Sequence, residues 1–173
     1  MNKLLKYIQG RSNLKPGVFA QLYIHLVFSP KYKERLLFKN IRSEVFSYIC
    51  GIITKRKHKS IIINGMPDHV HILYGLNPND SISDLVGCIK RESSSFINSK
   101  KWFRGNFHWQ DGYGAFSYGR SQLKSIYNYI LNQEQHHKKR SFGEEYKEFL
   151  QKYEVIYQDK YLFEFFNLPE ITD

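Results

Sequence analysis

The pattern of apolar and polar positions along this chain switches between the two-residue period of strands and the three-to-four-residue spacing of helices. Short runs rich in β-branched and aromatic residues predict strands, and longer segments with apolar residues at helical spacing predict helices. We predict strands at 18–30, 59–66, 69–76 and within 105–119, and helices at 40–57, 79–100, 121–137 and 141–153. The order is therefore strand, helix, hairpin, helix and strand, followed by two more helices.

This order of elements predicts the fold class. A β-α-β-β-α-β order is typical of an α+β fold with a ferredoxin-like split βαβ antiparallel sheet and helices on one face. The helix at 121–137, which bears two tyrosines, is then available to cover the other face. Ser81 and Ser141 have the sequence context of helix caps, with Asp84 and Glu144 at the respective capping-box positions.

The predicted third strand contains the triplet HVH. Because successive strand side chains point to opposite faces, His69, His71 and Leu73 share one face, and Val70 and Ile72 share the other. If the valine and isoleucine face the first two helices, the histidines face the added helix. Two adjacent neutral imidazoles suit a divalent metal ion. Such triplets also occur at partly exposed strand positions, so a metal site requires a third ligand and a reactive group elsewhere in the chain.

Helical spacing separates the two tyrosines of the segment 121–137. At about 100° per residue, one flank of this helix is apolar and the opposite flank is polar. The apolar flank consists of Leu123, Ile126, Tyr127, Ile130 and Leu131, and the polar flank of Gln122, Tyr129, Gln133 and His136. We therefore expect Tyr127 in the core and Tyr129 as the freer phenol, although a boundary tyrosine packed by its ring would show the same pattern.

Charge and aromatic content favour a nucleic-acid partner. The chain has 26 Lys and Arg against 16 Asp and Glu, a formal net charge of +10 and a pI near 9.5. It also contains 13 Tyr and 13 Phe, the kind of residue on which unpaired bases stack. Many basic proteins bind no nucleic acid, and most of these aromatic residues must fill the core. The basic stretches 55–59, 90–94 and 136–140 are candidate phosphate contacts.

Length and hydropathy indicate a single cytoplasmic domain. No apolar run approaches the roughly 20 residues that span a bilayer, so we expect no membrane segment. The N-terminus lacks the continuous apolar segment of a secretion signal. At 173 residues without an internal repeat or linker, the chain is expected to form one domain over 18–173 after a basic N-terminal leader, 1–17.

Three motifs together resemble a known family. HVH in the predicted strand, WQxGYxxFS before the tyrosine-bearing helix and YxxNQ within it occur in the order found in HUH single-tyrosine transposases. These enzymes move insertion sequences as single-stranded DNA, and they include IS200-like transposases and REP-associated relatives. The resemblance covers about residues 19–166, and the segment at about 141–166 looks like the family's C-terminal helical extension.

The resemblance implies a site and a mechanism. His69 and His71 would bind Mg²⁺ or Mn²⁺, with Gln133 as the third metal ligand. Tyr129 would attack the DNA, leaving a 5′-phosphotyrosine and a free 3′ hydroxyl that later displaces the tyrosine. The implied partner is single-stranded DNA with hairpin ends, bound by a homodimer. Tyr127, two residues before the assigned nucleophile, remains an alternative.

Other functional classes fit parts of the pattern. A non-catalytic protein that binds DNA hairpins would keep the fold and the charge but lose the chemistry. Another HUH nuclease, such as a replication initiator or a relaxase, would share the histidine pair but usually has additional domains. A metal-dependent hydrolase would need no tyrosine. The joint presence of two histidines, a tyrosine and a glutamine in the family's motifs favours the transposase.

Overall fold

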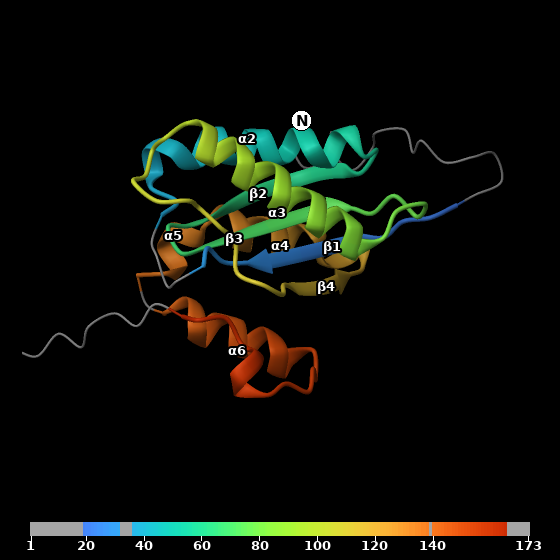
Figure 1. Ribbon diagram of the computed structural model, residues 1–173. Helices are drawn as coiled ribbons and strands as arrows, with labels where there is room; N and C mark the ends of the chain where they lie inside the picture. Colours follow the sequence, from blue (N-terminus) through green and yellow to red (C-terminus); the bar gives the residue numbers. More distant parts are fainter. Residues whose placement is uncertain (1–18, 32–35, 139, 166–173) are drawn as a thin grey trace, which may run out of the picture.

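The computed structural model describes residues 19–31, 36–138 and 140–165, in which four antiparallel strands form a sheet with helices on both faces (Figure 1). The strands are β1 (Tyr23–Phe28), β2 (Lys59–Met66), β3 (His69–Gly75) and β4 (Gly114–Tyr118), in the spatial order β2-β3-β1-β4. The helices are α2 (Lys39–Lys55), α3 (Ile82–Ser99), α4 (Leu123–Leu131), α5 (Gln133–His136) and α6 (Phe142–Lys152), with short 3₁₀ turns η1 (Arg120–Gln122) and η2 (Asp159–Tyr161). The predicted α+β, ferredoxin-like fold is confirmed. The predicted leader, 1–17, lies outside the described residues.

Two helices, α2 and α3, pack side by side on one face of the sheet (Figure 1). Val70 and Ile72 of β3 are fully buried on this face, as the two-residue period predicts, and share one apolar core with both helices. α3 begins after Ser81, whose Oγ accepts a hydrogen bond from the Asp84 N–H (3.0 Å), so the predicted cap is confirmed. None of the helices within the described ranges is long and apolar enough to cross a bilayer.

The remaining helices divide the opposite face between them. α4 lies over β2, and its Ile126 shares a second apolar cluster with Leu73 of β3. α6 lies over β1 and β4 instead. Its Phe149 ring centroid is 5.2 Å from that of Phe116 of β4 and 5.3 Å from that of His25 of β1. Figure 1 shows this arrangement, with α4 and α5 behind the sheet and α6 below its β1–β4 side. The histidines of β3 lie between these two helical covers.

The tyrosine-bearing helix is interrupted, whereas the sequence predicts one helix over 121–137. α4 ends at Leu131, Asn132 takes φ −96° and ψ 23°, and α5 follows. Asn64 Nδ2 of β2 donates hydrogen bonds to the carbonyl oxygens of Ile130 (2.8 Å) and Leu131 (3.1 Å). These carbonyls are therefore satisfied without a continuing helix. Leu131 is 52% exposed, contrary to the predicted apolar stripe, and Gln133 after the turn is fully buried.

Two predicted strands are shorter than expected. β1 begins at Tyr23 rather than at residue 18, and only the end of the segment 105–119 forms β4. Upstream of β4, Trp109 makes an isolated bridge with Pro30. Gly112 then has φ 75°, a left-handed conformation that favours glycine, so the predicted glycine-rich turn interrupts pairing before β4 begins.

α6 begins with the predicted capping box. The Ser141 N–H donates to Glu144 Oε2 (2.8 Å), and the Glu144 N–H donates to Ser141 Oγ (3.4 Å). The buried face of the helix consists of Phe142, Glu145, Tyr146, Phe149 and Leu150. This face is apolar except for Glu145, whose carboxylate is therefore buried in the interior.

Candidate active site: a buried histidine cluster beside a tyrosine

The two histidines of β3 are fully buried, and each has an outer partner on its Nδ1 atom. His69 Nδ1 donates a hydrogen bond to Asp68 Oδ1 (2.7 Å). His71 Nδ1 lies 2.9 Å from His25 Nε2 and donates to it in the tautomer that leaves the other ring nitrogen unprotonated. His71 Nε2 is buried and has no hydrogen-bond partner in the described part of the chain. Hydrogen-bond partners at Nδ1 orient metal-binding histidines in this way. Both Nε2 atoms are therefore available as metal ligands.

The predicted third ligand, Gln133, lies beside these histidines. It is the first residue of α5 and is fully buried. Its Oε1 atom is 3.2 Å from His69 Nε2, and its Nε2 atom donates to Glu145 Oε1 (3.1 Å). The structure therefore brings Gln133 of α5 together with the histidine pair of β3.

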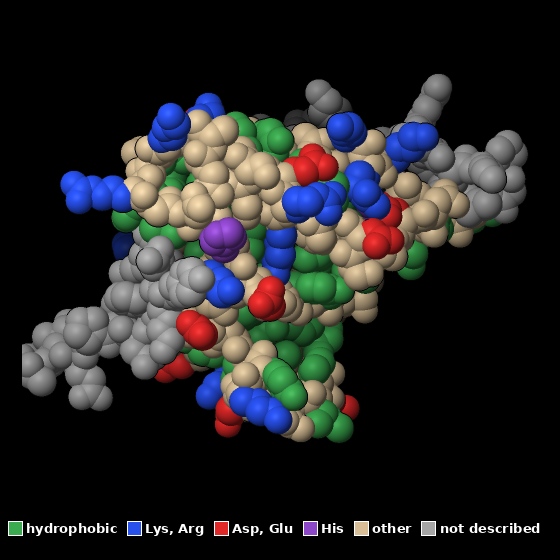
Figure 2. Space-filling model, in the orientation of Figure 1, with side chains coloured by type: hydrophobic (Ala, Val, Ile, Leu, Met, Phe, Trp, Pro, Cys, Tyr) green, Lys and Arg blue, Asp and Glu red, His purple; other side chains and the backbone are tan. Residues whose placement is uncertain are grey.

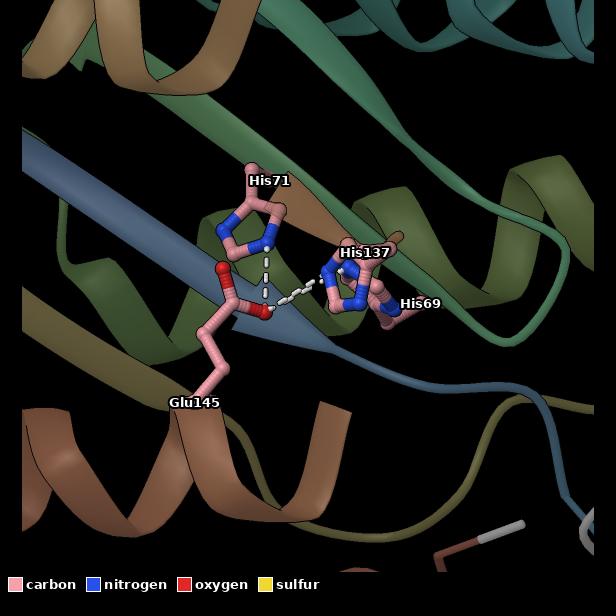
Figure 3. Close-up of side chains that lie close together, drawn as sticks. All are labelled: His69, His71, His137 and Glu145. Carbon is pink, nitrogen blue, oxygen red and sulfur yellow. Dashed lines mark hydrogen bonds and ion pairs between the residues drawn. The ribbon is translucent and has the colours of Figure 1, made fainter. Parts of the chain in front are cut away.

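Two further side chains, His137 and Glu145, complete the cluster, and neither was singled out from the sequence. Glu145 Oε2 lies 3.1 Å from His137 Nε2, 3.6 Å from His71 Nε2 and 3.7 Å from His69 Nε2 (Figure 3). The available signal for His137 was its position four residues after the predicted glutamine ligand, which places both on one helical face. The available signal for Glu145 was its position on the apolar side of a capped helix.

Burial dominates the electrostatics of the cluster. Burial raises the pKa of Glu145 to about 7, against the opposing charge of His69. Burial and then repulsion from His69 hold the pKa of His71 well below its usual value. They also lower the pKa of His137 to about 4. For His69, burial is outweighed by the hydrogen bond to Asp68 and the nearby Glu145 carboxylate, so its pKa is raised.

Tyr129 lies next to the histidine cluster. Its ring packs edge-on against His71, with centroids 5.9 Å apart, and against Phe149 of α6, with centroids 5.7 Å apart. Its hydroxyl is buried and has no hydrogen-bond partner among the described residues. The sequence predicts the freer phenol here, whereas in the structure this hydroxyl is buried. Tyr127 is half-buried as well, and both tyrosines contact the apolar cluster that contains Leu73. Tyr129 also has the ring contact with His71.

A cavity of about 500 Å³ opens between the tyrosine-bearing helix and α6. Its lining includes Tyr129 together with aromatic, hydroxyl and cationic side chains, among them Tyr118, Ser125, Arg140, Phe149 and Lys152. Glu145 and His137 also line it, so the cavity reaches the histidine cluster. Tyr129, His137 and the two cations Arg140 and Lys152 therefore line the same cavity.

Four other polar residues have different places in the structure. Asp68 orients His69, and Asn132 forms the turn between α4 and α5. Gln110 holds the C-terminal segment, because its side chain accepts from the Glu164 N–H (2.9 Å) and donates to the Glu164 carbonyl (3.0 Å). His136 is exposed and packs against the ring of Tyr129.

Comparison with known proteins identifies relatives over most of this fold. The family model described as "Transposase IS200 like" matches residues 18–133, more than half of the chain. The ISDra2 transposase TnpA of Deinococcus radiodurans is 26% identical over 122 residues, which cover 68% of this chain and 87% of that protein. The transposase for insertion sequence element IS200 of Salmonella typhimurium is 28% identical over 114 residues, covering 63% and 74% of the two chains.

Solved structures show the same architecture. The crystal structure of a putative transposase from Deinococcus radiodurans has a TM-score of 0.54 and 25% identity, covering 70% of this chain and 97% of that one. A REP-associated tyrosine transposase bound to a REP hairpin also has a TM-score of 0.54, at 15% identity, covering 73% and 74% of the two chains. The match of the family model, together with the shared fold, establishes that this chain belongs to the IS200-like transposases.

Proposed function

We propose that this chain cleaves and rejoins single-stranded DNA at the ends of an insertion sequence, with Tyr129 as the nucleophile. Family membership supports a DNA-cleaving transposase. The observation that carries the finer assignment is the position of the Tyr129 ring, 5.9 Å from that of His71 and on the wall of the adjoining cavity. Both tyrosines touch the apolar cluster under α4, but Tyr127 is not among the residues that line the cavity.

His69, His71 and Gln133 would hold a divalent metal ion, Mg²⁺ or Mn²⁺. Their donor atoms fit such an ion, because the Nδ1 partners leave both imidazole Nε2 atoms directed inward and the glutamine contributes an amide oxygen. When bound, the ion would act as a Lewis acid that withdraws charge from the scissile phosphate. The residues of the chain would position that phosphate beside the phenol.

In the proposed cleavage step, a bond forms between the Tyr129 oxygen and phosphorus, and the bond from phosphorus to the DNA 3′ oxygen breaks. The phenol loses its proton and the departing 3′ oxygen gains one. The product is a 5′-phosphotyrosine with a free 3′ hydroxyl. Because a phenol ionises near pH 10, well below an aliphatic hydroxyl, it is also a good leaving group when a 3′ hydroxyl attacks in the rejoining step.

The DNA would enter through the cavity beside Tyr129, where Arg140 and Lys152 provide positive charge and aromatic rings provide stacking surfaces. The face formed by α2 and α3 carries Lys and Arg side chains with Asp and Glu among them, rather than one continuous basic patch (Figure 2). The bound REP hairpin of one structural relative supports a substrate with hairpin ends. We also propose a homodimer acting in the cytoplasm, and sedimentation of the purified chain measures its oligomeric state.

Metal removal tests the proposed chemistry. We expect the full chain to form a covalent adduct with 3′-end-labelled single-stranded DNA from the flanks of its own gene, because the 5′ phosphate of the labelled fragment stays on the protein. The adduct should appear on a denaturing gel with Mn²⁺ or Mg²⁺ and disappear with a chelator. An adduct that forms equally well with the chelator contradicts the metal site. DNA that binds without ever forming an adduct supports the non-catalytic hairpin binder instead.

A further inference from the structure

The C-terminal helix α6 adds a carboxylate to the histidine cluster that the motif residues do not include. We propose that Glu145 and His137 are additional ligands of the divalent metal ion assigned above, making a site suited to a transition metal such as Mn²⁺. This inference rests on the proposed function, because it extends the ligand set given there. Both residues lie beyond residue 133, where the family match ends, so the extended site involves the C-terminal region of this chain.

The distances between donor atoms fit a single coordination shell. Metal–ligand bonds of about 2.1–2.2 Å place neighbouring ligands about 3.0 Å apart in an octahedron and about 3.5 Å apart in a tetrahedron. Glu145 Oε2 lies 3.1 Å from His137 Nε2 and 3.6 to 3.7 Å from the Nε2 atoms of the β3 histidines. His137 Nε2 lies 3.0 Å from Gln133 Oε1. The ligand atoms of the three histidines and Glu145 all lie within 4.8 Å of one another.

A hydrogen bond at Nδ1 orients His137, as it orients the histidines of β3. Its Nδ1 atom lies 3.0 Å from the carbonyl oxygen of Arg140 and donates to it in the tautomer that leaves Nε2 unprotonated. Its position four residues after Gln133 places both side chains on one helical face, directed at β3. All three imidazoles in the cluster are therefore held from the outside through Nδ1 and present Nε2 inward, as metal-binding histidines do (Figure 3).

Glu145 places a carboxylate in the interior of the protein. The residue is only 7% exposed, and a buried carboxylate needs a nearby positive charge. Within the described residues, the ion pairs of Glu145 are with histidines alone and include no Lys or Arg. A divalent ion would neutralise the carboxylate while the imidazoles remain neutral ligands.

Two consequences follow from this ligand set. Three imidazole nitrogens favour Mn²⁺ and later transition metals over Mg²⁺, which prefers oxygen ligands. The ion would also connect α6 to β3 and α5, because its ligands come from all three elements. Phe142 of α6 already stacks on the ring of His69 at a centroid distance of 4.2 Å, so metal binding would add to an existing contact and stabilise the docked helix.

Manganese binding to the full chain tests the inference. The free Mn²⁺ signal in electron paramagnetic resonance is titrated for the wild type, Glu145→Gln and Glu148→Gln. We expect Glu145→Gln to weaken Mn²⁺ binding by about tenfold or more, because it replaces a charged ligand by an isosteric neutral one. Glu148→Gln should bind like the wild type, since Glu148 lies on the same helix, is exposed and pairs with Arg140. Circular dichroism of the metal-free variants checks that both fold.

A second measurement counts the imidazole ligands of the ion in the wild-type chain. X-ray absorption of the Mn²⁺-loaded wild-type chain should show the multiple scattering of three imidazoles. Two imidazoles, or an unchanged Mn²⁺ affinity in Glu145→Gln, would overturn the inference and leave the proposed function in place, provided that His71→Ala loses the ion. If His71→Ala binds Mn²⁺ as tightly as the wild type, the metal site of the proposed function fails as well.

Discussion

Tyr129→Phe is expected to abolish the covalent protein–DNA adduct, whereas Tyr127→Phe should retain it. Removing the phenolic oxygen of Tyr129 removes the atom that bonds to phosphorus, so cleavage should fall by roughly 10³-fold or more. The change deletes a hydroxyl that is buried without a hydrogen-bond partner in the described part of the chain, so the folded state loses no observed interaction. Adduct formation by 3′-end-labelled single-stranded DNA, resolved on a denaturing gel, measures both variants.

Tyr127→Phe is the matched control, because it makes the same chemical change two residues away on the same helix. The Tyr127 ring packs with the cluster of Leu73 and Ile126, and phenylalanine preserves that packing. If Tyr127→Phe lost the adduct and Tyr129→Phe retained it, the nucleophile would be Tyr127.

The parts of the fold that follow from local periodicity could be predicted. The two-residue period of β3 alone assigns Val70 and Ile72 to the helical layer and places His69 and His71 on the other face, as observed. The Ser141 cap likewise locates the start of α6. Such features depend on neighbouring residues, so a sequence contains them directly.

The parts that depend on distant contacts could not be predicted in this way. The break at Asn132 is accompanied by hydrogen bonds from Asn64, which lies in a different strand and has no periodic relation to the helix. Gln133 and His137 follow this break, and both contact the histidines of the cluster. Glu145 reads as one of several acidic residues in the first turns of α6, and only the packing of that helix against the sheet carries it to the histidines.

Gly65→Ala is expected to destabilise the fold by about 3 kcal/mol and to weaken metal binding at the same time. Gly65 of β2 lies opposite Val70 of β3, in the hairpin that bears the histidines. An added Cβ atom would overlap the carbonyl oxygen of His69 and lie 2.9 Å from the Cα atom of Val70. Both are backbone atoms, so the clash is relieved only by moving the two strands apart, which displaces His69 from Gln133. Chemical denaturation measures the free energy of unfolding, and Mn²⁺ titration measures the site.

The same glycine-to-alanine substitution at Gly51 is expected to stabilise the fold, in contrast to that at Gly65. Gly51 lies exposed inside α2, and an added Cβ atom there would meet nothing within 4 Å. Alanine restricts the unfolded chain more than glycine does, so this variant should be more stable than the wild type by about 0.5–1 kcal/mol and should bind Mn²⁺ equally well. If Gly65→Ala proved as stable as Gly51→Ala, the close approach of β2 to β3 at the histidine pair would be wrong. The placement of His69 beside Gln133, which depends on that approach, would then lose its structural basis.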